Sequence, residues 1–244
     1  MSEKVWNKYI KGFKFLLPFI LMQVLFSNII SNLEIIEFSF FDMGKSFATK
    51  FSELKPMMLS NLLPIIFNLI AGSLFYAFLM IIIRSIVNFD DVNYRESFKE
   101  SLILYPRYLA VSSISATVFI GLIFIGLWDL AIPFIVILSI LFSAVLEPCT
   151  FYLVYNDEEI IDSLKNGIAI GKRYFVEILF ISIIVSVIGG AIGALIGYFI
   201  EGIVATTIKN FILYSAYMYA NIYIMNICRK EANIGDKAMT LEYD

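Results

Sequence analysis

The sequence predicts an all-α integral membrane protein, with six helices that cross the bilayer and amphipathic helices along the cytoplasmic surface. Of its 244 residues, 60% are hydrophobic and only 16% are charged, whereas a soluble domain has roughly 25% charged residues. Six apolar stretches also approach the roughly 20 residues that a helix needs to cross the hydrocarbon layer. We therefore expect residues 1–244 to form a single membrane domain.

The composition also excludes several classes of function. The chain contains no histidine, so histidine-based nucleophile pairs and histidine-ligated zinc or haem cannot form within it. Its two cysteines, Cys149 and Cys228, lack the spacing of a redox or metal motif. A net charge of −3 without a long basic block argues against nucleic-acid binding. We therefore expect no enzyme activity, no cofactor or metal, and no nucleic-acid partner.

The expected spans follow one another with short connections. They cover approximately residues 13–31, 61–83, 108–127, 130–155, 174–199 and 206–228, with an outer loop at 32–60 and a cytoplasmic tail at 229–244. The first follows a basic stretch, as in a secretory signal, but it is longer and lacks an A-x-A-like cleavage site, so we expect it to be retained as a span. Trp128 and Asp129 leave little room between the third and fourth spans, which predicts a tight helical hairpin.

The distribution of basic residues predicts the orientation. All 18 Lys and Arg residues except Lys45, Lys50, Lys55 and Lys209 fall on one side of the expected spans. Cytoplasmic segments are enriched in Lys and Arg. We therefore expect a multi-pass protein of the cell membrane with both termini in the cytoplasm.

The outer loop also has a pattern of its own. Phe47, Phe51 and Leu54 recur at helical spacing among lysines, which predicts a helix on the outer surface. Such a helix either covers a cavity between the spans or serves as an anchor.

Two segments resemble each other, residues 97–109 and 163–175, because Ser, Lys, Arg and Tyr recur at the same relative positions. Each is expected to begin as a cytoplasmic amphipathic helix, the second capped by Asn156. Each then turns at an Arg-Tyr pair that anchors it at the interface, Arg107-Tyr108 and Arg173-Tyr174. A weaker third copy surrounds Trp6. A true duplication of one interfacial helix plus two spans, and a pattern shared by any interfacial helix, both remain open.

On these residues, Ser97-x-Lys99 with Arg107-Tyr108 and Ser163-x-Lys165 with Arg173-Tyr174, and on the six-span layout, the chain resembles a broad group of prokaryotic membrane proteins. This group includes the YciC type and the membrane domain attached to some glycerophosphodiester phosphodiesterases. The resemblance implies a six-helix fold and a membrane location, and it supplies no catalytic residues. The phosphodiesterase activity is not implied, because it belongs to a separate soluble domain in those relatives.

Glu147 and Pro148 form the main candidate binding site, because they lie within the fourth expected span. An ionisable group inside a membrane is costly to bury and often functional, and a proline removes a helix hydrogen bond. Together they predict a polar notch for a cation, a proton or a headgroup amine. The structural alternative is that Glu147 lies near the cytoplasmic end and pairs with Arg107 or Lys172.

Two further patterns concern the last two spans. Polar residues follow faces of the sixth: Tyr214, Tyr217 and Asn221 on one, and Tyr219, Tyr223 and Asn226 on another. They indicate either a ligand-binding surface or interhelical hydrogen bonds. The fifth carries two stripes of small residues, Ser186, Gly190 and Ala194, and Gly189, Gly193 and Gly197. These favour close helix packing, within the chain or against a second protomer.

Two functions are compatible with these patterns. The first is a transport-related or accessory membrane protein that holds or passes a lipid or hydrophobic peptide between its helices. Such a protein could also work with an ATPase, because the chain has no P-loop of its own. The second is a structural or regulatory bundle that binds another membrane protein. An intramembrane lipid enzyme ranks last, because no acidic pair or metal-ligand cluster is visible.

Overall fold

The computed structural model describes residues 2–31, 47–125, 132–200 and 202–242, and in this part of the chain every regular element is a helix. The helices are α1 (Ser2–Ser31), α2 (Phe47–Asn88), α3 (Tyr94–Ile125), α4 (Ile132–Asn156), α5 (Ile160–Arg173), α6 (Phe175–Phe199) and α7 (Ile203–Glu242). The predicted all-α class is therefore confirmed. The expected hairpin turn at Trp128 and Asp129 lies outside the described residues.

Within the described residues, five helices are long and apolar enough to cross a membrane, which confirms a multi-pass membrane protein. The five segments are Lys4–Asn28, Leu69–Asn88, Tyr94–Leu122, Ile137–Asn156 and Phe175–Phe199. The expected sixth span at 206–228 lies within α7, which is more polar because tyrosines and asparagines interrupt its apolar residues. The sixth span therefore stays a prediction.

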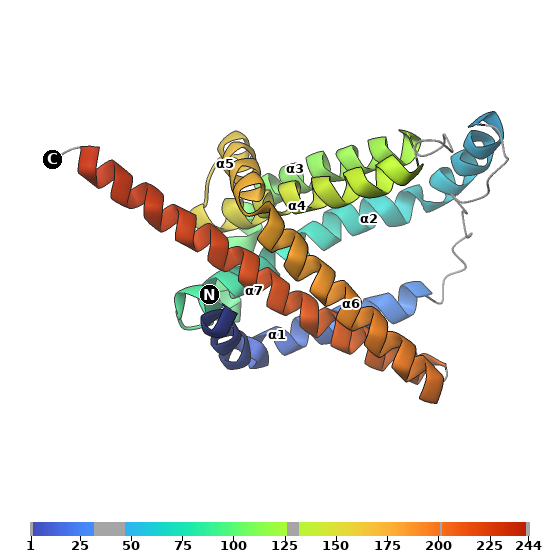
Figure 1. Ribbon diagram of the computed structural model, residues 1–244, viewed down its shortest axis with the longest axis horizontal. Helices are drawn as coiled ribbons and strands as arrows, with labels where there is room; N and C mark the ends of the chain where they lie inside the picture. The colour runs from blue at the N-terminus through green and yellow to red at the C-terminus, as the bar shows by residue number, and fades with distance from the viewer. Residues whose placement is uncertain (1, 32–46, 126–131, 201, 243–244) are drawn as a thin grey trace.

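The helices form two arms that meet at one end of the molecule (Figure 1). One arm consists of α2, α3 and α4, and the other of α1, α6 and α7, with both α1 and α6 in contact with α7. The arms join where the N-terminus and α5 lie, and diverge toward the other end. We call the joined end the basic end, because Arg84, Arg107 and Arg229 contact the ends of α2 and α4 and the connection that follows α4 there.

The hydrophobic core is concentrated near the basic end. There α2, α4 and α7 contact one another and contribute side chains with no exposed surface, including Ile83, Leu153 and Met225. Toward the other end, large apolar side chains such as Phe134 and Leu195 are exposed. Exposed apolar surface suits contact with lipid chains. Among the described residues, the packing therefore closes the molecule at the basic end.

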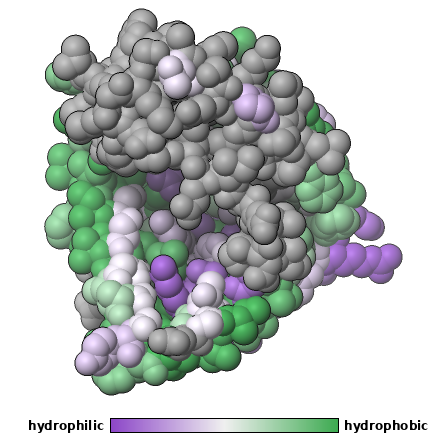
Figure 2. Space-filling view, turned by 90° about the vertical axis from the view of Figure 1, so that its right-hand side faces the viewer, coloured by the Kyte–Doolittle hydropathy of each residue, from purple (hydrophilic) through white to green (hydrophobic). Residues whose placement is uncertain are grey.

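The opposite end is hollowed (Figure 2). This view faces the right-hand side of Figure 1, where the arms diverge, and it shows hydrophilic residues inside a hollow with hydrophobic residues along its left and lower sides. Near this end, Asn28 of α1 donates a hydrogen bond to Thr207 of α7 at 2.9 Å, and Asn210 donates to Ser27 at 3.0 Å. Polar contacts thus join α1 and α7 near this end.

The boundary of the expected outer loop requires correction. Residues 32–46 lie outside the described part, but the chain is helical from Phe47 onward and continues without a break into the span expected at 61–83. The resulting 42-residue helix α2 is about 63 Å long at a rise of roughly 1.5 Å per residue. That is about twice the hydrocarbon thickness. The amphipathic stripe at Phe47, Phe51 and Leu54 therefore belongs to an extension of α2 and not to a separate helix.

The two similar segments differ at their Arg-Tyr pairs. The first does not turn there, because α3 runs unbroken through Pro106, Arg107 and Tyr108. The second turns at Tyr174, between α5 and α6. The second segment turns because Gly167 and Gly171 bring α5 against the backbone of α4. The chain must therefore change direction before it enters α6.

The start of α5 also differs from the expectation. Asn156 does not cap α5 but ends α4, and α5 begins after Glu159 without a side-chain cap. The residue after Asn156, Asp157, has a φ of 54°. The end of α2 repeats this arrangement, since Asn88 is followed by Phe89 with a φ of 64°. The chain therefore leaves α2 and α4 in the same way, through an Asn and a left-handed residue.

Candidate functional site

Glu147 lies on α4, roughly 14 Å along the helix axis from the last residue of α4. The helix continues through the neighbouring Pro148, which has no N–H and therefore leaves the carbonyl of Ala144 without its usual helical donor. Pro148 itself is buried. The expected break in hydrogen bonding thus occurs without a break in the helix.

Glu147 lines a groove between α3 and α4 that has a volume of about 210 Å³. Its other lining residues carry hydroxyl groups or apolar side chains: Ser112, Ser115 and Phe119 on α3, and Ser143, Leu146 and Thr150 on α4. Hydroxyls both donate and accept hydrogen bonds, while an ionised carboxylate only accepts. The groove can therefore accept several hydrogen bonds next to an apolar surface.

The Glu147 carboxylate is not held by a basic residue. Arg107 is paired with Asp157 at 2.5 Å, and Lys172 is exposed on α5. Thr150 donates a hydrogen bond to the backbone oxygen of Glu147 at 3.1 Å and not to its carboxylate. Among the residues that the structure describes, no ion pair or hydrogen bond reaches that carboxylate. An unpaired carboxylate in an apolar setting is costly, so a ligand that pairs with it would be bound favourably.

Other polar side chains continue from the groove toward α7. Tyr108, of which only 5% is exposed, lies near Glu147 and also near Tyr76 of α2. Tyr76 in turn lies near Gln23 of α1 and Tyr214 of α7. Within the described residues, the side-chain oxygen of Gln23 is buried without a hydrogen-bond partner. A series of polar groups, in which 40% of Tyr76 is exposed, therefore leads from α4 toward α7.

Gln23, Tyr76 and Tyr108 are members of this series that the sequence pattern did not predict. The pattern had placed Tyr108 at the lipid interface, whereas its ring packs in the hydrophobic core. The signal that could have found all three residues is a hydrogen-bonding side chain within an otherwise apolar run.

The polar residues predicted on α7 divide into different environments. Tyr214 packs against the core, Asn221 is half-buried, and 40% of Tyr217 is exposed. The other polar face makes interhelical hydrogen bonds: Tyr223 donates to Glu177 at 3.0 Å, and Asn226 accepts one from Lys8 at 2.7 Å. Of the three candidate ligand-binding residues on α7, the structure thus brings Tyr214 into the series that begins at Glu147.

The two small-residue stripes on α6 face different surroundings. A Cβ atom at Gly189 would lie 2.3 Å from Leu213 of α7, and one at Gly193 would lie 2.9 Å from Lys209 of α7. A Cβ at Gly190 or Gly197 would have no neighbour within 4 Å, and Ser186 and Ala194 are exposed. Gly189 and Gly193 therefore pack α6 against α7 within the chain, whereas the stripe through Gly190 is uncovered.

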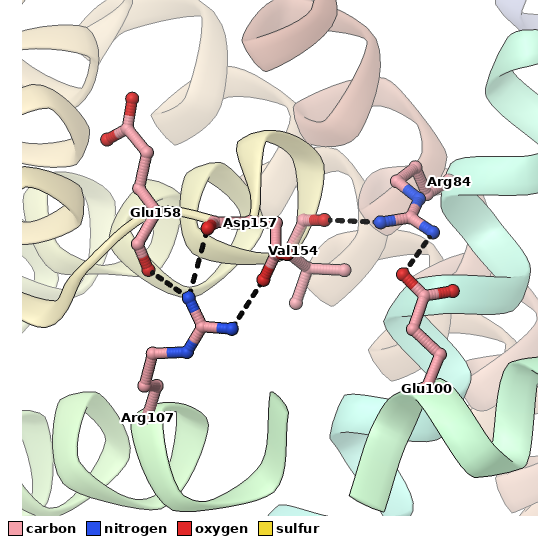
Figure 3. A network of polar contacts seen from close by, with 6 residues as sticks. All are labelled: Arg84, Glu100, Arg107, Val154, Asp157 and Glu158. Carbon is pink, nitrogen blue, oxygen red and sulfur yellow. Dashed lines mark hydrogen bonds and ion pairs between the residues drawn. The ribbon is translucent and has the colours of Figure 1, made fainter. Parts of the chain in front are cut away.

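The predicted anchor Arg107 holds the connection between α4 and α5 (Figure 3). It donates to the backbone oxygens of Asp157 and Glu158, both at 3.0 Å. Arg84 of α2 donates similarly to the backbone oxygen of Val154 at 3.0 Å and pairs with Glu100 of α3 at 2.6 Å. The last carbonyls of a helix lack intrahelical donors, so these guanidinium groups satisfy the end of α4. The basic end is thereby fixed by charged contacts as well as by its core.

The second predicted anchor pair contacts another helix. Arg173 forms an ion pair with Glu231 of α7, and the Tyr174 hydroxyl donates to the same carboxylate at 2.6 Å. The joint between α5 and α6 is therefore attached to the part of α7 that follows the expected span.

Comparisons with known protein families, with curated proteins and with solved structures find no match.

Proposed function

We propose that this multi-pass membrane protein binds an amphipathic molecule, a lipid or a hydrophobic peptide, and holds or passes it between its helices in a transport-related or accessory role. The observation that carries this proposal is the unpaired Glu147 carboxylate in a groove of about 210 Å³. A carboxylate without a counter-ion in an apolar setting favours a ligand that brings a cation or a strong donor.

The lining of the groove supports a ligand with an amine. An ammonium group or a peptide amino group could pair with Glu147 while the hydroxyls of Ser112, Ser143 and Thr150 contact its other polar atoms. Apolar chains of the same ligand would lie against Phe119 and Leu146. No member of this set needs to act as a catalyst, and we propose no enzymatic role.

We further propose that α7 provides the sixth span and that the basic end faces the cytoplasm. The enrichment of Lys and Arg on the expected inner segments supports this orientation. The exit from α2 at Asn88 and Phe89, repeated from α4 at Asn156 and Asp157, supports a duplicated unit. With this orientation the hollow of Figure 2 opens outward and the closed core faces inward. The same orientation would present α5 to a cytoplasmic ATPase.

The proposal is tested by native mass spectrometry of the protein extracted in mild detergent, with Glu147→Gln as the test variant. Glu177→Gln is the matched control, because it makes the same change at an exposed carboxylate that accepts a hydrogen bond from Tyr223. The expected result is a bound lipid or peptide on the wild type and on the control that is reduced at least tenfold on Glu147→Gln, since loss of a charged partner costs about 1.5–3 kcal/mol.

Two outcomes would contradict the proposal. One is a ligand-free protein in all three forms, which would leave the groove without an occupant. The other is an equal amount of ligand on Glu147→Gln and on the wild type, because binding would then not depend on the carboxylate.

One observation favours a second function, a structural or regulatory bundle that binds another membrane protein. The stripe of Ser186, Gly190 and Ala194 on α6 is exposed, and small residues permit close approach of another helix. Under this alternative, Gly190→Leu would abolish co-purification of a membrane partner from native membranes without changing the stability of the isolated protein. Co-purification that survives Gly190→Leu would exclude the stripe as its interface.

A further inference from the structure

A second cavity lies at the basic end, apart from the Glu147 groove. It has a volume of about 130 Å³ and is bounded by α1, the end of α2 and the connection to α3. Its lining residues are Lys8, Lys11, Gly12 and Phe15 from α1, Ile86 from α2, and Phe89, Asp90 and Val92 from the connection between α2 and α3. A single water needs only roughly 10–15 Å³, so the cavity has room for a small polar group.

Lys8 is the central cation of this cavity, and only 4% of its surface is exposed. Its ammonium donates to the neutral side chain of Asn226 at 2.7 Å and lies 5.0 Å from the centre of the Phe89 ring. No carboxylate pairs with it among the described residues. Buried lysines are uncommon unless they are paired, and an ammonium has three donors. Lys8 therefore keeps a positive charge and donor capacity that the protein does not neutralise.

Further positive charge surrounds Lys8. Lys11 lines the same cavity, and the charges of Lys4 and Arg229 also act on Lys8. Arg229 is oriented by a hydrogen bond of 2.7 Å to the backbone oxygen of Val87. Asp90 is the one acidic residue in the lining, and it is exposed at the rim. Cations thus outnumber acids, so the cavity favours an anion.

The remaining lining indicates that the anion belongs to a lipid. Phe15, Ile86 and Val92 give the cavity an apolar wall, and 66% of Phe89 is exposed beside it. Close by on α1, 51% of Trp6 and 54% of Ile10 are exposed. Aromatic and apolar side chains next to lysines are typical of a surface at the level of lipid headgroups.

We propose that this cavity binds the phosphate headgroup of an anionic phospholipid, with Lys8 and Lys11 as its ligands. A charged donor and a phosphate oxygen form a strong hydrogen bond, and Lys8 is held in place by Asn226 before the lipid arrives. The acyl chains would pass along Phe15 and Phe89 toward the bilayer. The site does not depend on Glu147 or on the proposed function.

The test is a titration of delipidated protein in detergent with short-chain phosphatidylglycerol, and with phosphatidylcholine of the same chain length, followed by native mass spectrometry. The wild type is expected to prefer phosphatidylglycerol. Lys11→Gln should weaken phosphatidylglycerol binding on the order of tenfold and reduce the preference for it over phosphatidylcholine. Lys11 is exposed, so this variant should fold, and Lys8→Met extends the test to the buried cation. Lys165→Gln, an exposed lysine on α5, is the charge-matched control.

Three outcomes would overturn the proposal. Equal binding of the two lipids would remove the need for an anion, and an equal loss in Lys11→Gln and Lys165→Gln would indicate a general charge effect. Complete displacement of the lipid by millimolar inorganic phosphate would assign the cavity to free phosphate. Glu147→Gln should leave phosphatidylglycerol binding unchanged, so the two proposals can fail independently.

Discussion

Replacement of Gly167 by alanine should destabilise the packing of α5 on α4. A Cβ atom at this position would lie 2.4 Å from the Cα and 2.8 Å from the backbone nitrogen of Cys149. Both neighbours are backbone atoms, which cannot rotate away as a side chain can, so α5 as a whole must move. Overpacking of this kind costs about 1–3 kcal/mol, and we expect a loss near 3 kcal/mol.

The expected loss can be measured as a change in Tm. For a chain of this size, roughly 2–4 °C is lost per kcal/mol, so Gly167→Ala should melt about 6–12 °C below the wild type in detergent. Gly190→Ala is the matched control, because a Cβ there has no neighbour within 4 Å, and its Tm should stay within about 2 °C of the wild type. A Gly167→Ala protein that melts with the wild type would refute the close contact between α4 and α5.

Three further predictions concern the arginine contacts, the buried cysteines and the orientation. Arg107→Met should lower the unfolding free energy by about 2 kcal/mol. Arg173→Met should lower it by less than about 1 kcal/mol, because 64% of the Arg173 side chain is exposed. Equal losses for the two variants in thermal denaturation would contradict this difference. Cys149 and Cys228 are both fully buried, so a maleimide should label them only after unfolding, and rapid labelling of the folded protein would argue against the described core. A reporter fused after the last residue should be active only as a cytoplasmic enzyme, and activity of a periplasmic reporter at that position would reverse the proposed orientation.

The general architecture could be predicted from the sequence because it depends on composition and length. Apolar runs such as Phe175–Phe199 have few folded alternatives to a membrane helix. The left-handed conformations of Phe89 and Asp157, each of which follows an Asn, could not be predicted. A positive φ in a residue other than glycine leaves no reliable signal in one sequence. The boundary of α2 was missed for a different reason, because its amphipathic start at Phe47 looked separate from the apolar run that it joins.

The candidate site was predictable only in part. Glu147 stands out as a charge inside an apolar run, and its importance can be argued from its cost of burial. Its relation to Arg107 could not be derived, because an arginine reaches many acceptors and the structure gives it Asp157 instead. The contribution of Tyr108 depends on which way one helix faces, and this is decided by packing between helices and not by local pattern. Lys8 was counted only as one of many basic residues, since burial cannot be read from a basic stretch.

The most direct test of the central claim is the reaction of Glu147 with a hydrophobic carbodiimide, which modifies carboxyl groups in apolar surroundings and is detected by peptide mass spectrometry. The protein would be treated before and after delipidation, and modification of the exposed Glu177 by a water-soluble carbodiimide would serve as the reference. A binding groove predicts weak modification of Glu147 in the ligand-bound protein and strong modification after delipidation. Equal modification in both preparations, or none in either, would contradict the claim that Glu147 binds a ligand within the membrane.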